Sequence, residues 1–435
     1  MTKRLIALLA ALSLSVTMLA GCGNDNKDKK EETTTTTTTT AASGDENKTP
    51  DDNGKEESDL KAPVADAPFD IKNGPTENMM TRSILREGNL ARLASKLQYA
   101  LDNKKEYTNV VFVGDSITAG SSAASSNQYV NQFTRWWEEN ISFYVNTTNA
   151  GIGATDTYLA VHRAERDVLS KDPDIIFIEF INDANNDFYK TAMDSLVRKC
   201  LAYESQPAVI LVEMTMEDGT CPQGVHTEIA EYYDIPVISY HDAVLPEIAA
   251  GNFTWKDISP DNIHPNDAGH KMLAQLLENF ITVVKDDLAN IDKTIDTEIP
   301  EAAMGDKYAN AIVANRDSAE VTVVDEGSFT DKPSFYQNFT NGWGTTTGGT
   351  ITFEVEAKNI GMVYNKNVSG TFGIAKILVD GVEVKTINAD FPGGWGSYAC
   401  MEEFYASDET AKHTVTIEIG DTGKTNFDIY SLLIS

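Results

Sequence analysis

The sequence predicts a three-layer α/β domain followed by an all-β domain. In the middle of the chain, short apolar runs alternate with stretches of helical periodicity. Near-continuous apolar strands separated by helices are typical of a parallel sheet covered on both faces. After about residue 294 the apolar period changes to two, which indicates antiparallel strands in a β-sandwich or jelly roll. The predicted parts are a leader (1–21), a tether (22–75), an α/β domain (76–292) and a β domain (293–435).

The leader has the pattern of a secretory signal peptide. Lys3 and Arg4 precede an apolar run over 5–18, which is shorter than the ~20 residues of a membrane-spanning helix. The run ends in Leu-Ala-Gly-Cys, which resembles a bacterial lipobox. That resemblance implies that Cys22 carries lipid and anchors the protein on the extracytoplasmic face of a cell membrane. An ordinary cleaved signal with an incidental cysteine is the alternative.

The tether is polar and acidic, and includes an unbroken threonine run over 33–40. A segment without large apolar side chains cannot offset its ordering entropy by burial, so we expect a solvated spacer. Residues 23–66 hold 12 acidic and 6 basic side chains, whereas the whole chain holds 66 and 35, a net charge of −31. Most of the negative charge therefore belongs to the folded domains. It disfavours nucleic acid and strongly anionic polymers as partners.

The α/β domain is expected to begin with an amphipathic helix over 81–103. The apolar runs predict four strands, over 110–113, 174–181, 208–212 and 235–238. Further helices are expected over 128–139, 155–170, 190–204, 225–233 and 266–285. In open α/β sheets, reactive groups lie at the carboxyl ends of the strands.

Polar clusters follow these strands. Ser116 comes just after the first strand, Asn182 follows the second, and Asp261 and His264 precede the last helix. A serine hydroxyl becomes a nucleophile when a base such as histidine removes its proton. An acidic side chain then orients the imidazole. Ser116 in isolation would be a helix N-cap, but together with the other clusters it indicates catalysis.

Four sequence blocks resemble those of the SGNH (GDSL-type) hydrolase superfamily. They are Gly114-Asp115-Ser116, Asn149-Ala150-Gly151-Ile152-Gly153-Ala154, Asn182-Asp183 and Asp261-Asn262-Ile263-His264-Pro265. The resemblance covers about residues 81–285. It implies a flavodoxin-like sheet and a carboxylic ester hydrolase that uses neither a cofactor nor a metal ion. The nucleophile motif G-x-S-x-G of α/β-hydrolases is absent, because Thr118 takes the place of its second glycine.

The resemblance also implies a role for each matched position. Ser116 is the expected nucleophile, His264 the general base, and Asp261 the residue that orients His264. Asn182 and the backbone N–H of Ser116 are expected to donate to the oxyanion, together with an N–H from Gly153 or Ala154.

Two positions depart from the superfamily pattern. The superfamily usually has glycine where Ala154 stands, and also where Phe180 stands, two residues before Asn182. A bulky Phe180 is expected to narrow the acyl pocket. Asp115 and Asp183 are expected to hold loops by accepting backbone hydrogen bonds.

The remaining histidines and cysteines carry no motif. His270 is expected to be structural, and His162, His226 and His241 have no motif context. Cys200, Cys221 and Cys400 allow either a Cys200–Cys221 disulfide or three unpaired thiols.

The β domain is expected to contain strands over 321–323, 351–355, 375–386 with a turn at Asp380-Gly381, and 413–419. Its aromatic side chains in glycine-rich surroundings are candidates for stacking on sugar rings: Trp343, Trp395, Tyr336 and Tyr398. A domain that only packs against the catalytic unit is the alternative.

We therefore expect a short-chain esterase, most plausibly one that removes O-acetyl groups from a polysaccharide. A small ester remains open as the substrate, and we infer no obligate protein partner. The alternatives are a lipase-like acyl hydrolase or thioesterase, and a non-catalytic carbohydrate-binding lipoprotein.

Overall fold

The computed structural model describes residues 70–332, 339–420 and 423–435. The predicted leader, Cys22, nearly all of the tether, and Tyr336 lie outside the described residues. Within those three ranges, no helix combines the length and apolarity needed to cross a bilayer.

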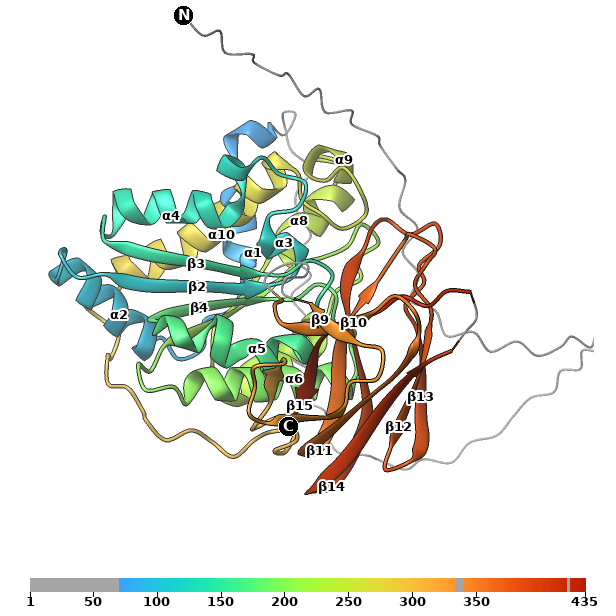
Figure 1. Ribbon diagram of the computed structural model, residues 1–435. Coiled ribbons are helices and arrows are strands. Elements are labelled where there is room, and N and C mark those ends of the chain that lie inside the picture. Colours follow the sequence, from blue (N-terminus) through green and yellow to red (C-terminus); the bar gives the residue numbers. More distant parts are fainter. Residues whose placement is uncertain (1–69, 333–338, 421–422) are drawn as a thin grey trace, which may run out of the picture. The chain divides into compact units, whose positions relative to one another are not determined.

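The α/β region is built on a six-stranded sheet (Figure 1). The strands are β1 (Ile84–Arg86), β2 (Thr108–Gly114), β3 (Val145–Gly151), β4 (Ile175–Glu179), β5 (Ala208–Glu213) and β6 (Val237–Ser239). They lie in the order β1-β6-β5-β4-β2-β3, and every neighbouring pair is parallel except β1 and β6. The predicted parallel sheet is confirmed, with an antiparallel edge strand that we did not predict.

Helices cover both faces of this sheet. The α-helices are α1 (Glu77–Ser83), α2 (Ala91–Asp102), α3 (Ser116–Ala119), α4 (Tyr129–Asn140), α5 (Thr157–Asp167), α6 (Asp187–Leu201), α7 (Gln223–Tyr233), α8 (Tyr240–Ala249), α9 (Trp255–Ile258) and α10 (Asp267–Asp286). Short 3-10 turns lie at Ile71–Asn73, Ser125–Asn127 and Leu169–Lys171.

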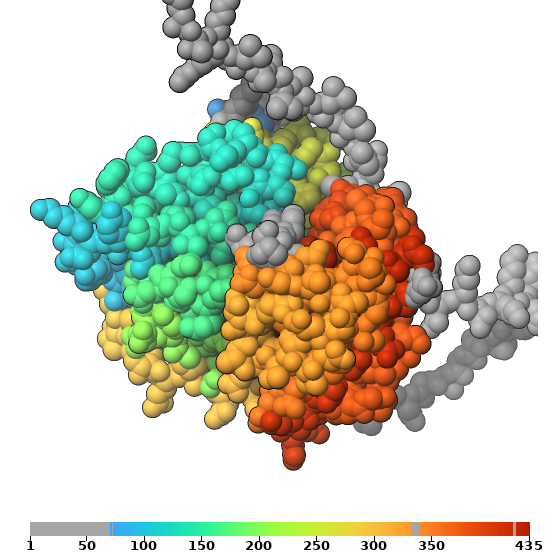
Figure 2. Space-filling view, in the orientation of Figure 1, coloured from blue at the N-terminus to red at the C-terminus, as the bar shows by residue number. Residues whose placement is uncertain are grey.

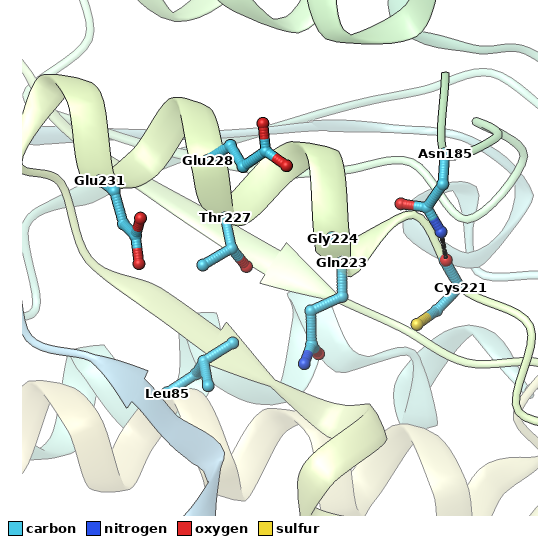
Figure 3. Close-up of a pocket in the computed structure, with 8 residues that line it drawn as sticks. All are labelled: Leu85, Asn185, Cys221, Gln223, Gly224, Thr227, Glu228 and Glu231. Atoms are coloured by element: carbon cyan, nitrogen blue, oxygen red, sulfur yellow. Dashed lines mark hydrogen bonds between the residues drawn. The ribbon is translucent and has the colours of Figure 1, made fainter. Parts of the chain in front are cut away.

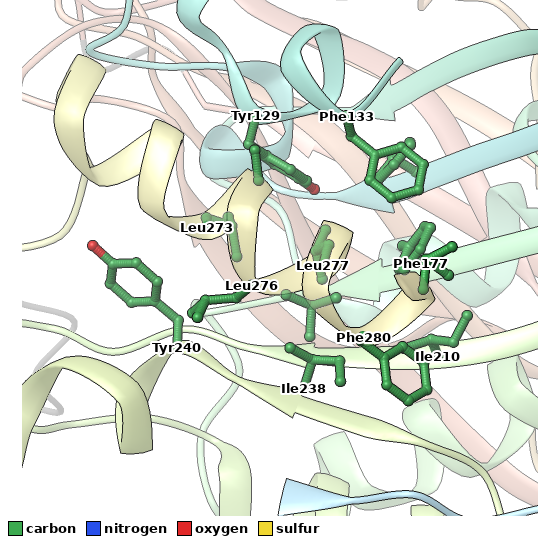
Figure 4. Close-up of a cluster of buried hydrophobic side chains, with 14 of the residues drawn as sticks. Tyr129, Phe133, Phe177, Ile210, Ile238, Tyr240, Leu273, Leu276, Leu277 and Phe280 are labelled. Carbon is green, nitrogen blue, oxygen red and sulfur yellow. The ribbon is translucent and has the colours of Figure 1, made fainter. Parts of the chain in front are cut away.

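Each face of the sheet has its own apolar cluster. Helices α2, α4, α8 and α10 pack on one face, where Phe133 of α4 and Leu277 of α10 lie in the same apolar cluster as Phe177 of β4 (Figure 4). Helices α5, α6 and α7 cover the other face. The two covered faces make the three layers that the sequence predicts.

The prediction of one continuous helix over 81–103 is wrong. Helix α1 ends at Ser83, strand β1 follows, and α2 starts only at Ala91. Gly88 lies between them at φ +57, and a Cβ there would lie 2.5 Å from the carbonyl carbon of Ile235. The chain therefore turns sharply against the backbone at β6 instead of continuing as a helix.

Strand β3 was missed because it lies at the edge of the sheet. Its sequence, Val-Asn-Thr-Thr-Asn-Ala-Gly, is polar, and its residues are only partly buried or exposed. A strand that packs on one side only carries no continuous apolar run. The sequence block that starts at Asn149 therefore begins inside this strand and runs on beyond its end at Gly151.

The β region is an antiparallel β-sandwich, as predicted. Its strands are β7 (Ile312–Ala314), β8 (Val321–Asp325), β9 (Thr330–Lys332), β10 (Gly342–Thr345), β11 (Gly349–Lys366), β12 (Ile374–Val379), β13 (Val382–Asn388), β14 (Tyr398–Ile419) and β15 (Phe427–Ile434). The turn between β12 and β13 has Asp380 at φ 52 and Gly381 at φ 79, and two positive φ angles suit a tight hairpin.

The two regions lie directly against each other (Figure 2), and they share a buried apolar cluster. Tyr158 and Leu159 of α5 belong to the same cluster as Val363 of β11 and Leu433 of β15. The β region therefore covers the outer side of α5. This matters for the site because α5 begins three residues after Ala154.

Several sequence predictions concern single side chains. Trp343 is fully buried against Phe353, so its expected contact with sugar is wrong: the ring belongs to the core of the β region. Trp395 is 47% exposed. Cys200, Cys221 and Cys400 are all free thiols, so the disulfide alternative is not formed.

Candidate active site

Ser116 comes just after the end of strand β2, which lies between β4 and the edge strand β3. The residue before it, Asp115, caps α3 by accepting a 3.0 Å bond from the Ile117 N–H at Oδ1. Ser116 is therefore the first helical residue and not the cap, which removes the structural alternative for this serine. Gly114 is required here, because a Cβ would lie 2.1 Å from the Thr118 Oγ1.

Three predicted residues form a chain of hydrogen bonds. Ser116 Oγ lies 2.9 Å from His264 Nε2, and His264 Nδ1 lies 2.9 Å from Asp261 Oδ2. The other Asp261 oxygen accepts the backbone N–H groups of His264 at 2.7 Å and Ile263 at 2.9 Å. Burial raises the pKa of Asp261, but the bonds from His264 outweigh it and lower that pKa overall. The geometry is that of a nucleophile, a base and an orienting carboxylate.

Two residues that we did not predict hold the loop of Asp261 and His264. The Trp255 indole N–H donates to the Asp261 carbonyl at 2.6 Å. Ser259 Oγ lies 2.8 Å from that carbonyl and 2.6 Å from the carbonyl of His264. Their only sequence signal is Thr254 and Asp257, three residues apart, which form the capping box of α9.

Asn182 is bonded to Asp115, the residue before Ser116, and both of its amide hydrogens already have acceptors. Nδ2 donates to Asp115 Oδ2 at 2.9 Å and to the Thr155 carbonyl at 3.1 Å. The backbone N–H of Asn182 donates to the same Asp115 oxygen at 3.2 Å. Asp115 therefore fixes the orientation of the Asn182 side-chain amide. An oxyanion would have to compete with the Thr155 carbonyl for one of its two N–H groups. The loop-holding role predicted for Asp115 agrees with these contacts.

The loop after β3 explains one departure from the superfamily pattern. Ala154 has φ 58, in the left-handed region where glycine is favoured. The chain keeps this backbone conformation without the residue that adopts it most easily. Phe180 is 1% exposed inside the apolar cluster under α5 and α6, so it does not narrow the acyl pocket as expected.

Arg163 ties two strand ends together, and sequence reasoning missed it. Its guanidinium is completely buried and donates to the Ala150 carbonyl at 2.7 Å and the Gly114 carbonyl at 3.2 Å. Asp167 pairs with it at 3.1 Å. The arginine thus holds the carboxyl ends of β2 and β3 together beside the site.

Carboxylates are buried under the site. Burial, followed by the charge of Glu179, raises the pKa of Asp115 well above its usual range. Burial likewise raises the pKa of Glu179 to about 7, although Thr118 donates to it at 2.7 Å. Burial, followed by the charge of Asp183, raises the pKa of Asp156 to about 7. The floor of the site is therefore crowded with acidic groups.

A cavity of about 410 Å³ lies along α7 and includes none of Ser116, His264 and Asp261 (Figure 3). Among the described side chains, no group of three His, Cys, Asp or Glu is arranged to hold a metal ion. In the β region, Trp395 stacks on Tyr398 with ring centres 4.9 Å apart, and both contact Phe391.

Comparison with known proteins decides the family of the α/β region. Residues 112–272 match the GDSL-like Lipase/Acylhydrolase family. The chain carries a GDSL-like acylhydrolase domain. It is a carboxylic ester hydrolase of the SGNH/GDSL type, as the four sequence blocks predict.

The whole two-region architecture of this GDSL-type hydrolase has solved counterparts. It is similar to a two-domain esterase, CEX, that is active on acetylated mannans, with 29% identity and a TM-score of 0.73 over 82% of this chain and 98% of that one. The same esterase co-crystallised with mannopentaose gives 29% identity and a TM-score of 0.74, over 82% and 97% of the two chains. No curated protein sequence matches significantly.

Proposed function

We propose that this GDSL-type hydrolase is an extracytoplasmic deacetylase that removes O-acetyl groups from a polysaccharide. The observation that carries the proposal is the hydrogen-bond chain from Ser116 through His264 to Asp261. In the first step Ser116 Oγ attacks the acetyl carbonyl and His264 Nε2 takes the hydroxyl proton. The oxyanion receives hydrogen bonds from Asn182 and backbone N–H groups.

The second half of the reaction releases acetate. The sugar alcohol leaves with the proton that His264 holds, and Ser116 remains acetylated. His264 then removes a proton from water, and the hydroxide attacks the acetyl-serine carbonyl. His264 returns that proton to the Ser116 oxygen and acetic acid departs, which ionises to acetate and a proton in the solvent. One water is consumed and no cofactor is needed.

The polysaccharide substrate is supported by similarity across both regions. The aligned esterase acts on acetylated mannans and shares both the α/β and the β region with this chain. Trp395, which is 47% exposed and stacks on the partly buried Tyr398, offers an aromatic ring of the kind that sugars stack on. Acetylated mannan is therefore the first polymer to test.

The location is part of the same proposal. A lipid on Cys22 would anchor the enzyme outside the cytoplasm, with the tether between membrane and enzyme. The support is the sequence itself, since a basic start, an apolar run and a Leu-Ala-Gly-Cys site occur at signal-peptide spacing.

Acetate release from acetylated mannan, acetylated xylan and an acetylated bacterial glycan tests the function. We expect release from mannan by the wild type, and none by Ser116→Ala. A panel of p-nitrophenyl esters should show a maximum at the acetyl ester. A maximum at long acyl chains would instead support a lipase-like enzyme, and equal rates for wild type and Ser116→Ala would support a binding protein.

A further inference from the structure

His226 lies under the proposed active site and bonds two buried carboxylates. The ring is on α7 and its side chain is 1% exposed. Its Nδ1 lies 3.1 Å from both carboxylate oxygens of Glu213, and its Nε2 lies 3.1 Å from Asp183 Oδ2. An ionised carboxylate only accepts hydrogen bonds, so with both acids ionised each ring nitrogen carries the hydrogen that is shared. The geometry is that of an imidazolium held between two acids.

The carboxylates come from the edge of the sheet where the site lies. Glu213 is the last residue of β5, and Asp183 follows β4 directly after Asn182. Asp183 also accepts from Thr157, at 3.0 Å from the backbone N–H and 2.5 Å from the hydroxyl. Thr157 starts α5, three residues after Ala154. One carboxylate thus links Asn182 to the loop that is expected to supply a further oxyanion donor.

Helix α7 is fixed to the same loop by a second set of bonds. Asn185 accepts from the Val225 N–H at 3.1 Å and donates to the Cys221 carbonyl at 2.6 Å (Figure 3). These bonds hold the start of α7 against the segment after Asp183. The position of His226 is therefore determined from both sides.

The charge of His226 follows from its neighbours. Burial opposes an imidazolium, but Glu213 and Asp183 outweigh it and raise the pKa of His226 to about 10. Without that cation, Asp183 and Glu213 would be buried at 0% and 1% exposure with no positive partner between them. Carboxylates in that state take up protons or move apart. Either change alters the acceptor that holds Thr157.

We propose that His226, clamped between Glu213 and Asp183, is a positioning residue for the oxyanion donors of the esterase. It touches no substrate. It acts through Asp183, which holds the segment of Asn182 and the start of α5 in a fixed relative position. The inference rests on the proposed reaction at Ser116. Its effect appears in the transition state, when the donors must meet the oxyanion, and not in ester binding.

The test compares His226→Ala and Glu213→Gln with the wild type on p-nitrophenyl acetate. We expect kcat to fall roughly 10- to 100-fold in His226→Ala, because a displacement of about 1 Å costs that much, while KM changes by less than about threefold. Inhibition by methylboronic acid, whose serine adduct mimics the oxyanion, should weaken by a similar factor. Glu213→Gln keeps His226 and should lose roughly three- to tenfold in kcat.

The matched control is His241→Gln. His241 also pairs with a carboxylate, Asp242 at 2.7 Å, but it has no contact with Asp183. This variant should keep wild-type kcat, and melting curves establish that each protein is folded. If His226→Ala does not fold, Glu213→Gln decides the question.

A wild-type kcat in folded His226→Ala or Glu213→Gln would overturn the inference, and so would a loss confined to KM. Failure of the wild type to hydrolyse p-nitrophenyl acetate, together with no boronate inhibition, would instead overturn the proposed reaction, and the inference with it.

Discussion

The α/β region and the β region differ in where they bury charge. Carboxylates in or beside the ends of β2 to β5 are less than 9% exposed: Asp115, Asp156, Glu179, Asp183 and Glu213. Among the described residues of the β strands, Asp428 is the buried carboxylate, and the other buried polar side chains there are not acidic: Thr345, Asn359, Asn365, His413 and Ser431. The two regions have similar apolar cores but different polar interiors.

The difference shows which region must hold loops in a fixed geometry. Burying a carboxylate is unfavourable unless it is hydrogen-bonded, so such groups persist where their bonds do something that apolar packing cannot. Asp115, Asp183 and Asp261 each accept backbone N–H groups of the segments that carry the proposed chemistry. The β region instead supports α5 through apolar contacts and presents Trp395 at the surface.

The largest effect should follow removal of the orienting carboxylate. We expect Asp261→Asn to lower kcat by about 10⁴-fold, because an amide no longer holds the His264 tautomer that accepts the Ser116 proton. The measurement is hydrolysis of p-nitrophenyl acetate. Asp292→Asn, an exposed aspartate, is the control and should keep wild-type activity. Equal activity in both variants would remove Asp261 from the mechanism.

A tryptophan pair tests the β region. We expect Trp343→Ala to lower the free energy of unfolding by about 3 to 5 kcal/mol, because it empties a fully buried site. Trp395→Ala should cost no more than about 1 kcal/mol, the scale of its aromatic contacts, and should weaken retention on immobilised mannan. Urea unfolding measures both. The assignment of core and surface would be reversed by a larger loss for Trp395→Ala.

Asn182→Ala should lower kcat by about 10²- to 10³-fold, the usual effect of losing one oxyanion donor. Asn146→Ala, on the exposed edge strand β3, is the matched control. Both variants should melt within a few degrees of the wild type. A change in KM alone would show that Asn182 binds substrate and does not stabilise the transition state.

The buried imidazolium should make stability depend on pH. The pKa of His226 is about 10 in the folded protein, above the usual 6.5. The charged ring therefore stabilises the folded protein fully below about pH 6.5, and this stabilisation is lost as the pH rises through about 10. Between these two pH values the free energy of unfolding falls by about 1.4 kcal/mol per pH unit. From pH 7 to 8.5 the wild type should lose about 2 kcal/mol more than His226→Gln. Glu213 and Asp183 face the ring, and Asp156 interacts in turn with Asp183. The difference in stability between the wild type and His226→Gln, taken at each pH, separates the contribution of His226 from theirs. If the free energies of unfolding of the two proteins changed in parallel with pH, His226 would not be charged in the folded protein.

The smallest effect concerns Ala154. We expect Ala154→Gly to raise the free energy of unfolding by up to about 1 kcal/mol, because glycine adopts φ 58 without strain. Glu165→Gly, at an exposed position inside α5, should instead destabilise by about 0.5 to 1 kcal/mol. Chemical denaturation distinguishes the two signs, and destabilisation by Ala154→Gly would show that this backbone conformation is not strained.

Much of the fold was predictable because most of the central strands are apolar and the helices are periodic. The polar edge strand β3 and the turn at Gly88 were not, since edge packing and close backbone contacts leave little trace in hydropathy. Ser116 and His264 were predictable because they occur in blocks at strand and helix ends. Asp261 and Asn182 were recognised in the same way.

The supporting residues of the site were beyond sequence reasoning. Arg163, His226, Trp255 and Ser259 act through contacts with segments that are close only after folding. A buried histidine or arginine on a helix has the same local pattern as an exposed one. The predicted sugar contact of Trp343 was wrong because glycine-rich surroundings are found both at exposed turns and inside a β-sandwich.

Covalent labelling of the nucleophile tests the central claim, that His264 activates Ser116, most directly. A fluorophosphonate should label the wild-type protein once, and peptide mass spectrometry should place the label on Ser116. His264→Ala should greatly slow the labelling and Ser116→Ala should abolish it, together with acetate release. Labelling of another residue, or ester hydrolysis that persists in Ser116→Ala, would contradict the account.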